Sequence, residues 1–263
     1  MLSYYVVYFT IMSFVGYIYE CFAMTLWTGK WENRGFLYGP IIPIYGVGSV
    51  IGLIVFGQVF TEYTPTFVFC VGFFGSALLE YPTSWALEKL FHAYWWDYSS
   101  APLNINGRIS FFSSLGFGLA AIIIVYIINP HLWPFILNVN NRLIEIISYI
   151  IVVIISVDAT LTISVLSSFE DKVSIANNYI NEYLSNTVEN INPSGKNLKE
   201  AIKYTKENVI DTGAEKVVDT MNFLYHGAIS RIKGFRNSSN EGINVLKSKI
   251  KNRINNIRKK NER

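Results

Sequence analysis

The first two-thirds of the sequence contains few charged residues. Over the whole chain of 263 residues, 16% are Asp, Glu, Lys or Arg, against about 25% in a typical soluble domain. Residues 1–169 hold only 5 of the 22 Lys and Arg and 8 of the 19 Asp and Glu. This scarcity argues against a soluble globular domain in 1–169 and indicates a membrane domain there, followed by a basic tail in 170–263.

Cysteine and histidine are also scarce. The chain has two cysteines and three histidines, and both Cys21 and Cys70 lie in apolar stretches. Neither has a second cysteine or a nearby histidine at the spacing that a metal site needs. We therefore expect two small apolar side chains with no disulfide, no bound metal and no cofactor.

Several sequence motifs of catalysis and processing are missing. There is no Gly-x-Ser-x-Gly, no His-Glu-x-x-His and no glycine-rich phosphate loop ending in Gly-Lys-Ser/Thr. The first residues lack the basic segment and cleavage site of a signal peptide, so the first apolar stretch is expected to persist as a helix. These absences argue against an enzyme, and any ATP hydrolysis is expected from another chain.

What the sequence does have is five long apolar stretches. A helix rises about 1.5 Å per residue and needs about 20 residues to cross a bilayer core of about 30 Å. The stretches predict an all-α, polytopic membrane helix bundle with five transmembrane helices at about 4–27, 40–60, 66–90, 109–128 and 144–168.

Three of these stretches carry an acid well inside them: Glu20, Glu80 and Asp158. A carboxylate at the centre of a bilayer costs at least about 2.5 kcal/mol on the insertion scale. We therefore expect the three acids to face the interior of the bundle, close to arginines or hydroxyl groups. For Asp158, hydroxyl partners from its own helix are the favoured account.

The distribution of Lys and Arg predicts the orientation. The tail holds 17 of the 22 basic residues, which places it in the cytoplasm under the positive-inside rule. Five spans then put the N-terminus outside, and Lys30, Arg34, Lys89 and Arg108 fall on the inner side. The expected location is the plasma membrane.

Four motifs lie around the predicted inner loops. They read Gly-Tyr-Ile-Tyr-Glu at 16–20, NRGFLYGPIIPIYG at 33–46, LEYPTSWALEKLF at 79–91, and WWDYS at 95–99 with NINGRIS at 104–110. In these motifs the chain resembles a bacterial family of multi-span membrane proteins, the ABC-transporter type IV family. The resemblance covers about residues 5–125, with Ile41-Ile42 and Tyr81-Pro82 as small departures, and it implies a permease-like membrane subunit.

The candidate site consists of the acids within the spans and the polar residues of the inner loops. Glu80, Ser84 and Glu88 follow one another at helical spacing and predict either a polar stripe along a cavity or a structural network closed by Arg34 or Arg108. Asp97 and His92, beside the tryptophans of the third loop, are candidates for binding a polar group. The full set is Glu20, Asn33, Arg34, Glu80, Ser84, Glu88, His92, Asp97, Asn104, Asn106, Arg108 and Asp158.

The tail shows apolar residues at helical spacing, which predicts three amphipathic helices broken at 192–195 and 237–240. The tail has three possible arrangements: contact with the anionic inner leaflet, a coiled coil, or partial disorder. Contact with the leaflet is favoured. Nucleic-acid binding is not expected, because acids are interspersed with the bases and aromatic residues are few.

The predicted function is transport of an unknown substrate by a permease-like subunit. Its expected partners are the lipid bilayer, a separate cytoplasmic ATPase and a second copy of the chain. Two alternatives stay open at this point: a membrane-embedded enzyme acting on lipid headgroups, and a structural or regulatory membrane scaffold.

Overall fold

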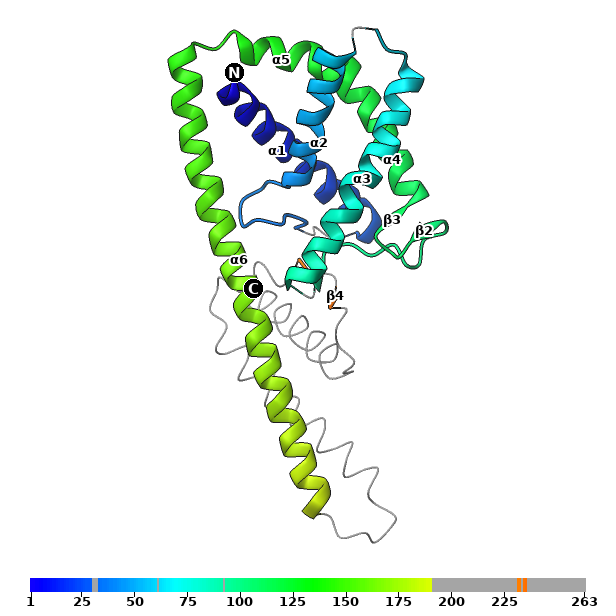
Figure 1. The fold of residues 1–263 in the computed structure, drawn as a ribbon, viewed down its shortest axis with the longest axis vertical. Coiled ribbons are helices and arrows are strands. Elements are labelled where there is room, and N and C mark those ends of the chain that lie inside the picture. Colours follow the sequence, from blue (N-terminus) through cyan, green and yellow to red (C-terminus); the bar gives the residue numbers. More distant parts are fainter. Residues whose placement is uncertain (30–32, 61, 92, 191–230, 233, 236–263) are drawn as a thin grey trace. The chain divides into compact units, whose positions relative to one another are not determined.

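The structure, a computed structural model, describes residues 1–29, 33–60, 62–91, 93–190, 231–232 and 234–235. The chain divides into two units: Met1–Lys89 with Tyr94–Thr162, and Leu90–Ala93 with Ile163–Arg263. The first unit holds all the apolar stretches up to Thr162. It consists almost entirely of helices, which confirms the predicted all-α class (Figure 1).

Each predicted stretch forms a helix in the structure. Two short π-helical segments, η1 and η2, continue α2 and α4 directly. The elements are α1 (Leu2–Thr28), α2 (Pro43–Ile54), η1 (Val55–Val59), α3 (Pro65–Phe91), α4 (Phe111–Ile123), η2 (Ile124–Ile128), α5 (Asn129–Leu137) and α6 (Asn141–Asn190).

In the part of the chain that the structure describes, four helical runs are long and apolar enough to cross a membrane, while Pro43–Val59 is apolar but shorter than 18 residues. The most apolar windows of the four long helices are only 11–28% buried within the protein. Large apolar side chains such as Leu78 and Ile154 are 76% and 61% exposed. Such surfaces are unfavourable in water and suited to hydrocarbon, so the chain is a multi-pass membrane protein.

The α1 helix packs closely against α2 (Figure 1). Tyr8 and Met12 of α1 join Leu53 of α2 in a buried cluster that also includes Ile136 and Ile144. Within this cluster the Tyr8 hydroxyl donates to Oδ1 of Asn129 at 2.6 Å. The phenol therefore has its hydrogen-bond partner although the side chain is buried.

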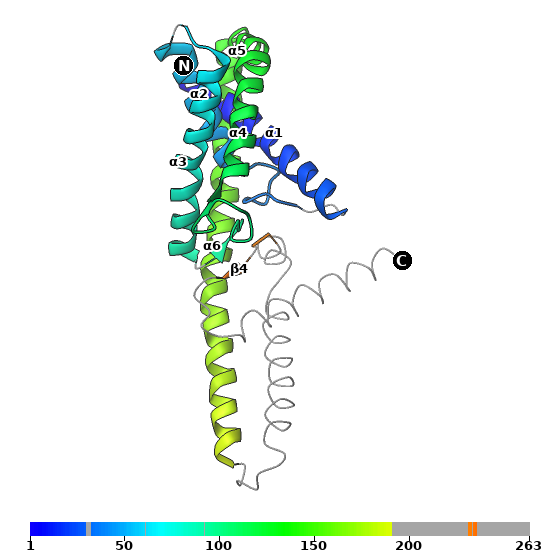
Figure 2. The ribbon, with the colours of Figure 1, turned by 90° about the vertical axis from the view of Figure 1, so that its right-hand side faces the viewer.

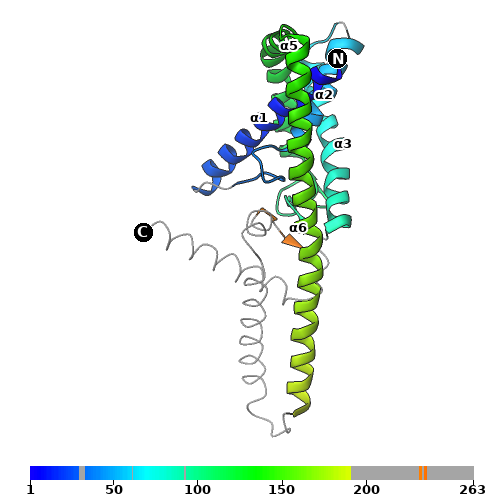
Figure 3. The ribbon, with the colours of Figure 1, turned by 90° about the vertical axis from the view of Figure 1, so that its left-hand side faces the viewer.

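A second close contact joins α3 to α4, which lie side by side (Figures 1 and 2). A Cβ atom at Gly72 would lie 3.1 Å from the Phe117 carbonyl oxygen, and one at Gly118 would lie 2.7 Å from the Phe69 ring. Small residues let the two backbones approach, which is how membrane helices associate without a hydrophobic driving force between them. The α1 helix is inclined to this pair (Figures 2 and 3).

The helical run of α4 continues beyond the predicted end of the fourth span. After η2 ends at Ile128, as predicted, α5 follows directly and extends to Leu137. Pro130 lies in the first turn of α5, where a missing N–H costs little. The segment 129–137, expected to be a connection, is therefore a helix.

The loop between α3 and α4 contains a small hairpin of β2 (Asn104–Ile105) and β3 (Ile109–Ser110). Asn106 and Gly107 both have positive φ, 53° and 66°. The Arg108 amide donates back to the Ile105 carbonyl at 3.0 Å. This turn, in which consecutive residues adopt left-handed geometry, favours an Asn-Gly pair, and it explains the local Asn-Gly-Arg sequence.

The α6 helix is longer than the predicted fifth span. It runs unbroken from Asn141 to Asn190, so the span 144–168 and the first predicted helix of the tail are one helix. No glycine or proline occurs between these bounds to end it. The two other helices predicted in the tail, and the break at 192–195, lie outside the described residues. The two remaining short strands are β1 (Ala93–Tyr94) and β4 (Gly234–Phe235).

Candidate functional site

Glu80 of α3 lies inside the bundle and is only 6% exposed. Its carboxylate is 3.2 Å from the Ser113 hydroxyl of α4 and 3.4 Å from the Tyr98 hydroxyl of the α3–α4 loop. The two hydroxyls are themselves 3.2 Å apart. We call Glu80, Tyr98 and Ser113 the Glu80 cluster.

Local structure at the start of α4 places Ser113 in this cluster. The Ser110 side chain is the N-cap of α4 and accepts the Ser113 amide at 3.1 Å. A serine N-cap satisfies one of the free N–H groups of the first turn. The cap therefore determines where the helix begins and directs the Ser113 hydroxyl toward α3.

Glu20 of α1 has a different partner from the arginine that the sequence suggested. In the described part of the chain its Oε1 accepts the Tyr45 hydroxyl of α2 at 2.6 Å. The Tyr45 ring occupies the position where a side chain at Gly16 would begin. Gly16 and Glu20 are one helical turn apart, so a glycine at 16 lets the tyrosine reach the acid.

Glu20 and Glu80 both affect the ionisation of Tyr98, which lies outside the spanning helices. Burial raises the pKa of the Tyr98 phenol well above its ordinary value, and the negative charges of Glu80 and, more weakly, Glu20 raise it further. Tyr98 is therefore a neutral hydroxyl donor near neutral pH. Both acids lie close enough to affect the same phenol.

The rest of the predicted stripe on α3 belongs to a separate group around Arg108. The Arg108 guanidinium lies 2.6 Å from Oε2 of Glu88 and 3.3 Å from the Ser84 hydroxyl. It also lies over the Tyr81 ring, 5.7 Å from the centroid. The stripe Glu80–Ser84–Glu88 is thus divided between two sites, and Arg108 neutralises Glu88, not Glu80.

Arg34 also contacts a group other than the predicted acid. Its Nη2 donates to the Trp95 carbonyl at 3.3 Å, and the neighbouring Phe36 ring lies 5.2 Å from the Trp95 ring. The loop before α2 and the loop after α3 are therefore joined to one another. This contact gives Arg34, Phe36 and Trp95 partners within the protein.

Five other predicted residues of these loops have partners within the protein or lie outside the described residues. Asn33 accepts the Gly35 amide, Asp97 accepts the Ser99 amide, and Asn104 accepts the Gly107 amide, at 3.0, 2.9 and 3.0 Å. These are side-chain-to-backbone turns. Asn106 donates to the Tyr81 hydroxyl at 3.0 Å, and His92 lies outside the described residues.

Asp158 of α6 binds the turn that precedes α2. Its two oxygens accept the amides of Tyr38 and Gly39 at 2.8 and 2.7 Å, and the Thr162 hydroxyl lies 3.2 Å away. The expected hydroxyl partner from its own helix is present. The two backbone donors from a distant segment were not predicted.

Three residues of the candidate site were not singled out in the sequence: Tyr45, Tyr98 and Ser113. Tyr45 and Tyr98 belong to motifs named above, and Ser113 lies three residues after one. The sequence does not distinguish these residues from the other aromatic and hydroxyl residues nearby. Among the described residues, no group of three His, Cys, Asp or Glu side chains is arranged to hold a metal ion. The acids that come together do so with hydroxyl groups.

The matched range of a known family includes all of these contacts. The model of the family described as "Putative ABC-transporter type IV" matches residues 7–163 of the 263. The chain belongs to this family. The match extends from α1 through Thr162, so it contains the Glu80 cluster, the Glu20–Tyr45 pair and Asp158 with its loop. No curated protein and no solved structure matches the chain.

Proposed function

We propose that this member of the ABC-transporter type IV family is a permease-like subunit that moves a solute through its helix bundle. In this proposal Glu20 and Glu80, with Tyr45, Tyr98 and Ser113, form the polar centre of the pathway. The family and the position of these acids within the helices support it together, because acids within membrane helices usually mark a substrate or ion route.

The main support for the proposal is that Glu20 and Glu80 have different kinds of partner from Glu88. Among the described contacts, Glu20 and Glu80 meet hydroxyl groups, whereas Glu88 meets the Arg108 guanidinium. A carboxylate neutralised by arginine has little to offer a ligand. A carboxylate among hydroxyls can hold a proton, bind a cation or accept a donor from a substrate.

A separate ATPase is the partner we propose for this subunit. The sequence has no phosphate-binding loop, so an ATP-driven transporter would need a second chain. The loop after α3 offers a candidate docking surface, because Leu103 and Ile105 are 75% and 56% exposed there. A photo-crosslinker at Leu103 should capture a protein that contains a Gly-rich phosphate loop.

The proposed topology keeps the N-terminus outside, with residues 1–169 in the plasma membrane and 170–263 as a cytoplasmic tail on the anionic inner leaflet. The distribution of Lys and Arg supports it. It requires the short run Pro43–Val59 to cross the membrane. Thiol labelling of single cysteines at Ser3 and Lys247, with Cys21 and Cys70 replaced by serine, should modify the two positions from opposite sides.

Comparison of solutes in cells and medium tests the transport proposal directly. A deletion strain should redistribute at least one solute, and the wild-type gene should reverse this change. Glu80→Gln should fail to reverse it at equal protein level, while Glu62→Gln, which changes an exposed acid outside the bundle, should reverse it fully. Full reversal by Glu80→Gln would remove the proposal.

The scaffold alternative is favoured by one observation, the neutralised Glu88–Arg108 pair. If the bundle has only a structural role, exchanging the charges of Glu88 and Arg108 should reverse any defect that either single substitution causes. The headgroup-enzyme alternative has less support, because Asp97 binds the local Ser99 amide. Altered lipid composition in the deletion strain, without solute redistribution, would favour that alternative.

A further inference from the structure

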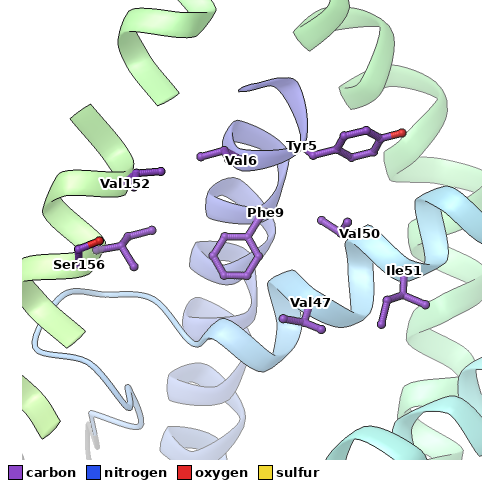
Figure 4. A pocket seen from close by; sticks show the side chains of 9 residues that line it. Tyr5, Val6, Phe9, Val47, Val50, Ile51, Val152 and Ser156 are labelled. Atoms are coloured by element: carbon purple, nitrogen blue, oxygen red, sulfur yellow. The ribbon is translucent and has the colours of Figure 1, made fainter. Parts of the chain in front are cut away.

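An apolar groove lies between α1, α2 and the first part of α6. It is an open groove of about 380 Å³, and each of the three helices contributes three lining residues. Figure 4 shows Val152 and Ser156 of α6 facing Val6 and Phe9 of α1, with Val47 of α2 below them. Nearly all of the lining side chains are aliphatic or aromatic.

The groove lies at the depth of the hydrocarbon. Val152 is about 16 Å along α6 from Asn141, at 1.5 Å per residue, which is close to the middle of a core of about 30 Å. The groove is also open to the surroundings, because Val47, Ile51 and Val152 are 41%, 47% and 46% exposed. It is therefore continuous with the lipid-facing surface of the protein.

Water is a poor occupant for this space. A buried water needs two to four polar partners, and the lining has two side chains with polar atoms, Ser156 and Tyr5. The Tyr5 hydroxyl accepts a hydrogen bond from Gln58 and keeps its own O–H as one donor. Two hydroxyl groups cannot hold a chain of waters in a groove of this size.

We propose that this groove binds one acyl chain of a membrane phospholipid. An unbranched, flexible chain follows a concave apolar surface, and such chains already border the groove on its open side. Because bulk lipid is as apolar as the lining, the gain comes from van der Waals contact on three sides and not from leaving water. The bound lipid should therefore exchange more slowly than the lipids around it.

Two valines of α6 provide a matched test. Val152 lines the groove, whereas its neighbour Val153, which is 62% exposed, does not. The protein purified in mild detergent should retain a phospholipid, detected by native mass spectrometry and by lipid extraction. Val152→Trp should lower retention about tenfold, because the indole occupies the groove, and Val153→Trp should leave it unchanged.

A labelling experiment on the wild-type protein provides a second test, which holds even if Val152→Trp disturbs folding. The wild-type protein is placed in vesicles of phosphatidylethanolamine and phosphatidylglycerol that contain a phosphatidylethanolamine with a diazirine on its acyl chain. After illumination, cross-links should concentrate on Phe9, Ile51 and Ile155 relative to Val153.

Equal labelling of all four, retention of no phospholipid by the wild-type protein, or equal loss in both tryptophan variants would overturn the proposal. A dimer that covers Val152 would also overturn it. The readout is lipid binding, so it does not depend on transport activity.

Discussion

The Asp158 carboxylate of α6 lies 2.7 Å from the backbone nitrogen of Gly39, in the turn before α2. A Cβ atom at position 39 would lie 2.9 Å from the same oxygen, so a larger residue there would push the acid away. With the Tyr38 amide as a second donor, the carboxylate binds two consecutive backbone amides. The third acid of the spans therefore positions the entry to α2.

Asp158→Asn should destabilise the protein. An amide nitrogen would then face a backbone donor, and an unsatisfied pair of this kind costs about 1–3 kcal/mol. Unfolding in mixed micelles with increasing SDS measures the change. Thr162→Val removes only the 3.2 Å hydroxyl contact and should cost less. Equal stability of Asp158→Asn and wild type would contradict the assigned role.

Gly16→Ala should separate Tyr45 from Glu20, because the added methyl group would overlap the Tyr45 ring. Overpacking of this kind costs about 1–3 kcal/mol. Gly75→Ala is the matched control, since a methyl group at Gly75 meets nothing within 4 Å, and alanine is the better helix former. The two variants should therefore move the SDS midpoint in opposite directions. Similar midpoints would show that α1 and α2 do not pack in the way described.

Arg108→Ala should destabilise more than the double change Glu88→Ala with Arg108→Ala. Removing one partner of a buried ion pair leaves an uncompensated charge and costs about 3 kcal/mol or more, whereas removing both avoids that cost. Arg108 and Glu88 side chains are only 10% and 21% exposed. A double-mutant cycle on unfolding free energies measures the coupling, and additive effects would mean that the pair contributes nothing.

Tyr98→Phe should change the response of the protein to alkaline pH. Burial and the charge of Glu80 raise the pKa of Tyr98 when the chain is folded, while an unfolded tyrosine ionises at about 10. The neutral phenol therefore contributes fully below about pH 10 and loses this contribution as the pH rises toward the folded pKa. Stability should fall less steeply above pH 10 in Tyr98→Phe than in wild type. Parallel curves would place Tyr98 outside the buried cluster.

The helices and their class were predictable because hydrocarbon imposes a simple rule on composition. A span must be long and apolar, and its backbone must pair with itself. Consequently α1 and α3 begin and end within two residues of the first and third apolar stretches, and η2 ends at the last residue of the fourth. The helix of α5 was missed because Asn129 and Pro130 suggest a loop, although a proline in the first turn is compatible with a helix.

The partners of the acids were not predictable from spacing along the chain. Helical periodicity placed Glu80, Ser84 and Glu88 on one face of α3, but the face is divided between the hydroxyls of Tyr98 and Ser113 and the guanidinium of Arg108. Tyr45 contacts Glu20 because Gly16 leaves room for its ring. Such contacts depend on the distance and rotation between two helices.

The amino-acid sequence alone determined that apolar helices with three embedded acids build this protein, since each helix meets its own requirement for length, hydropathy and backbone pairing. The tertiary structure decided that Glu20 and Glu80 lie among hydroxyls, that Asp158 holds a loop and that a further acid, Glu88, is neutralised by arginine. Local sequence cannot contain that information, because the deciding groups come from segments as far apart as Gly39 and Asp158 and meet only when the helices pack.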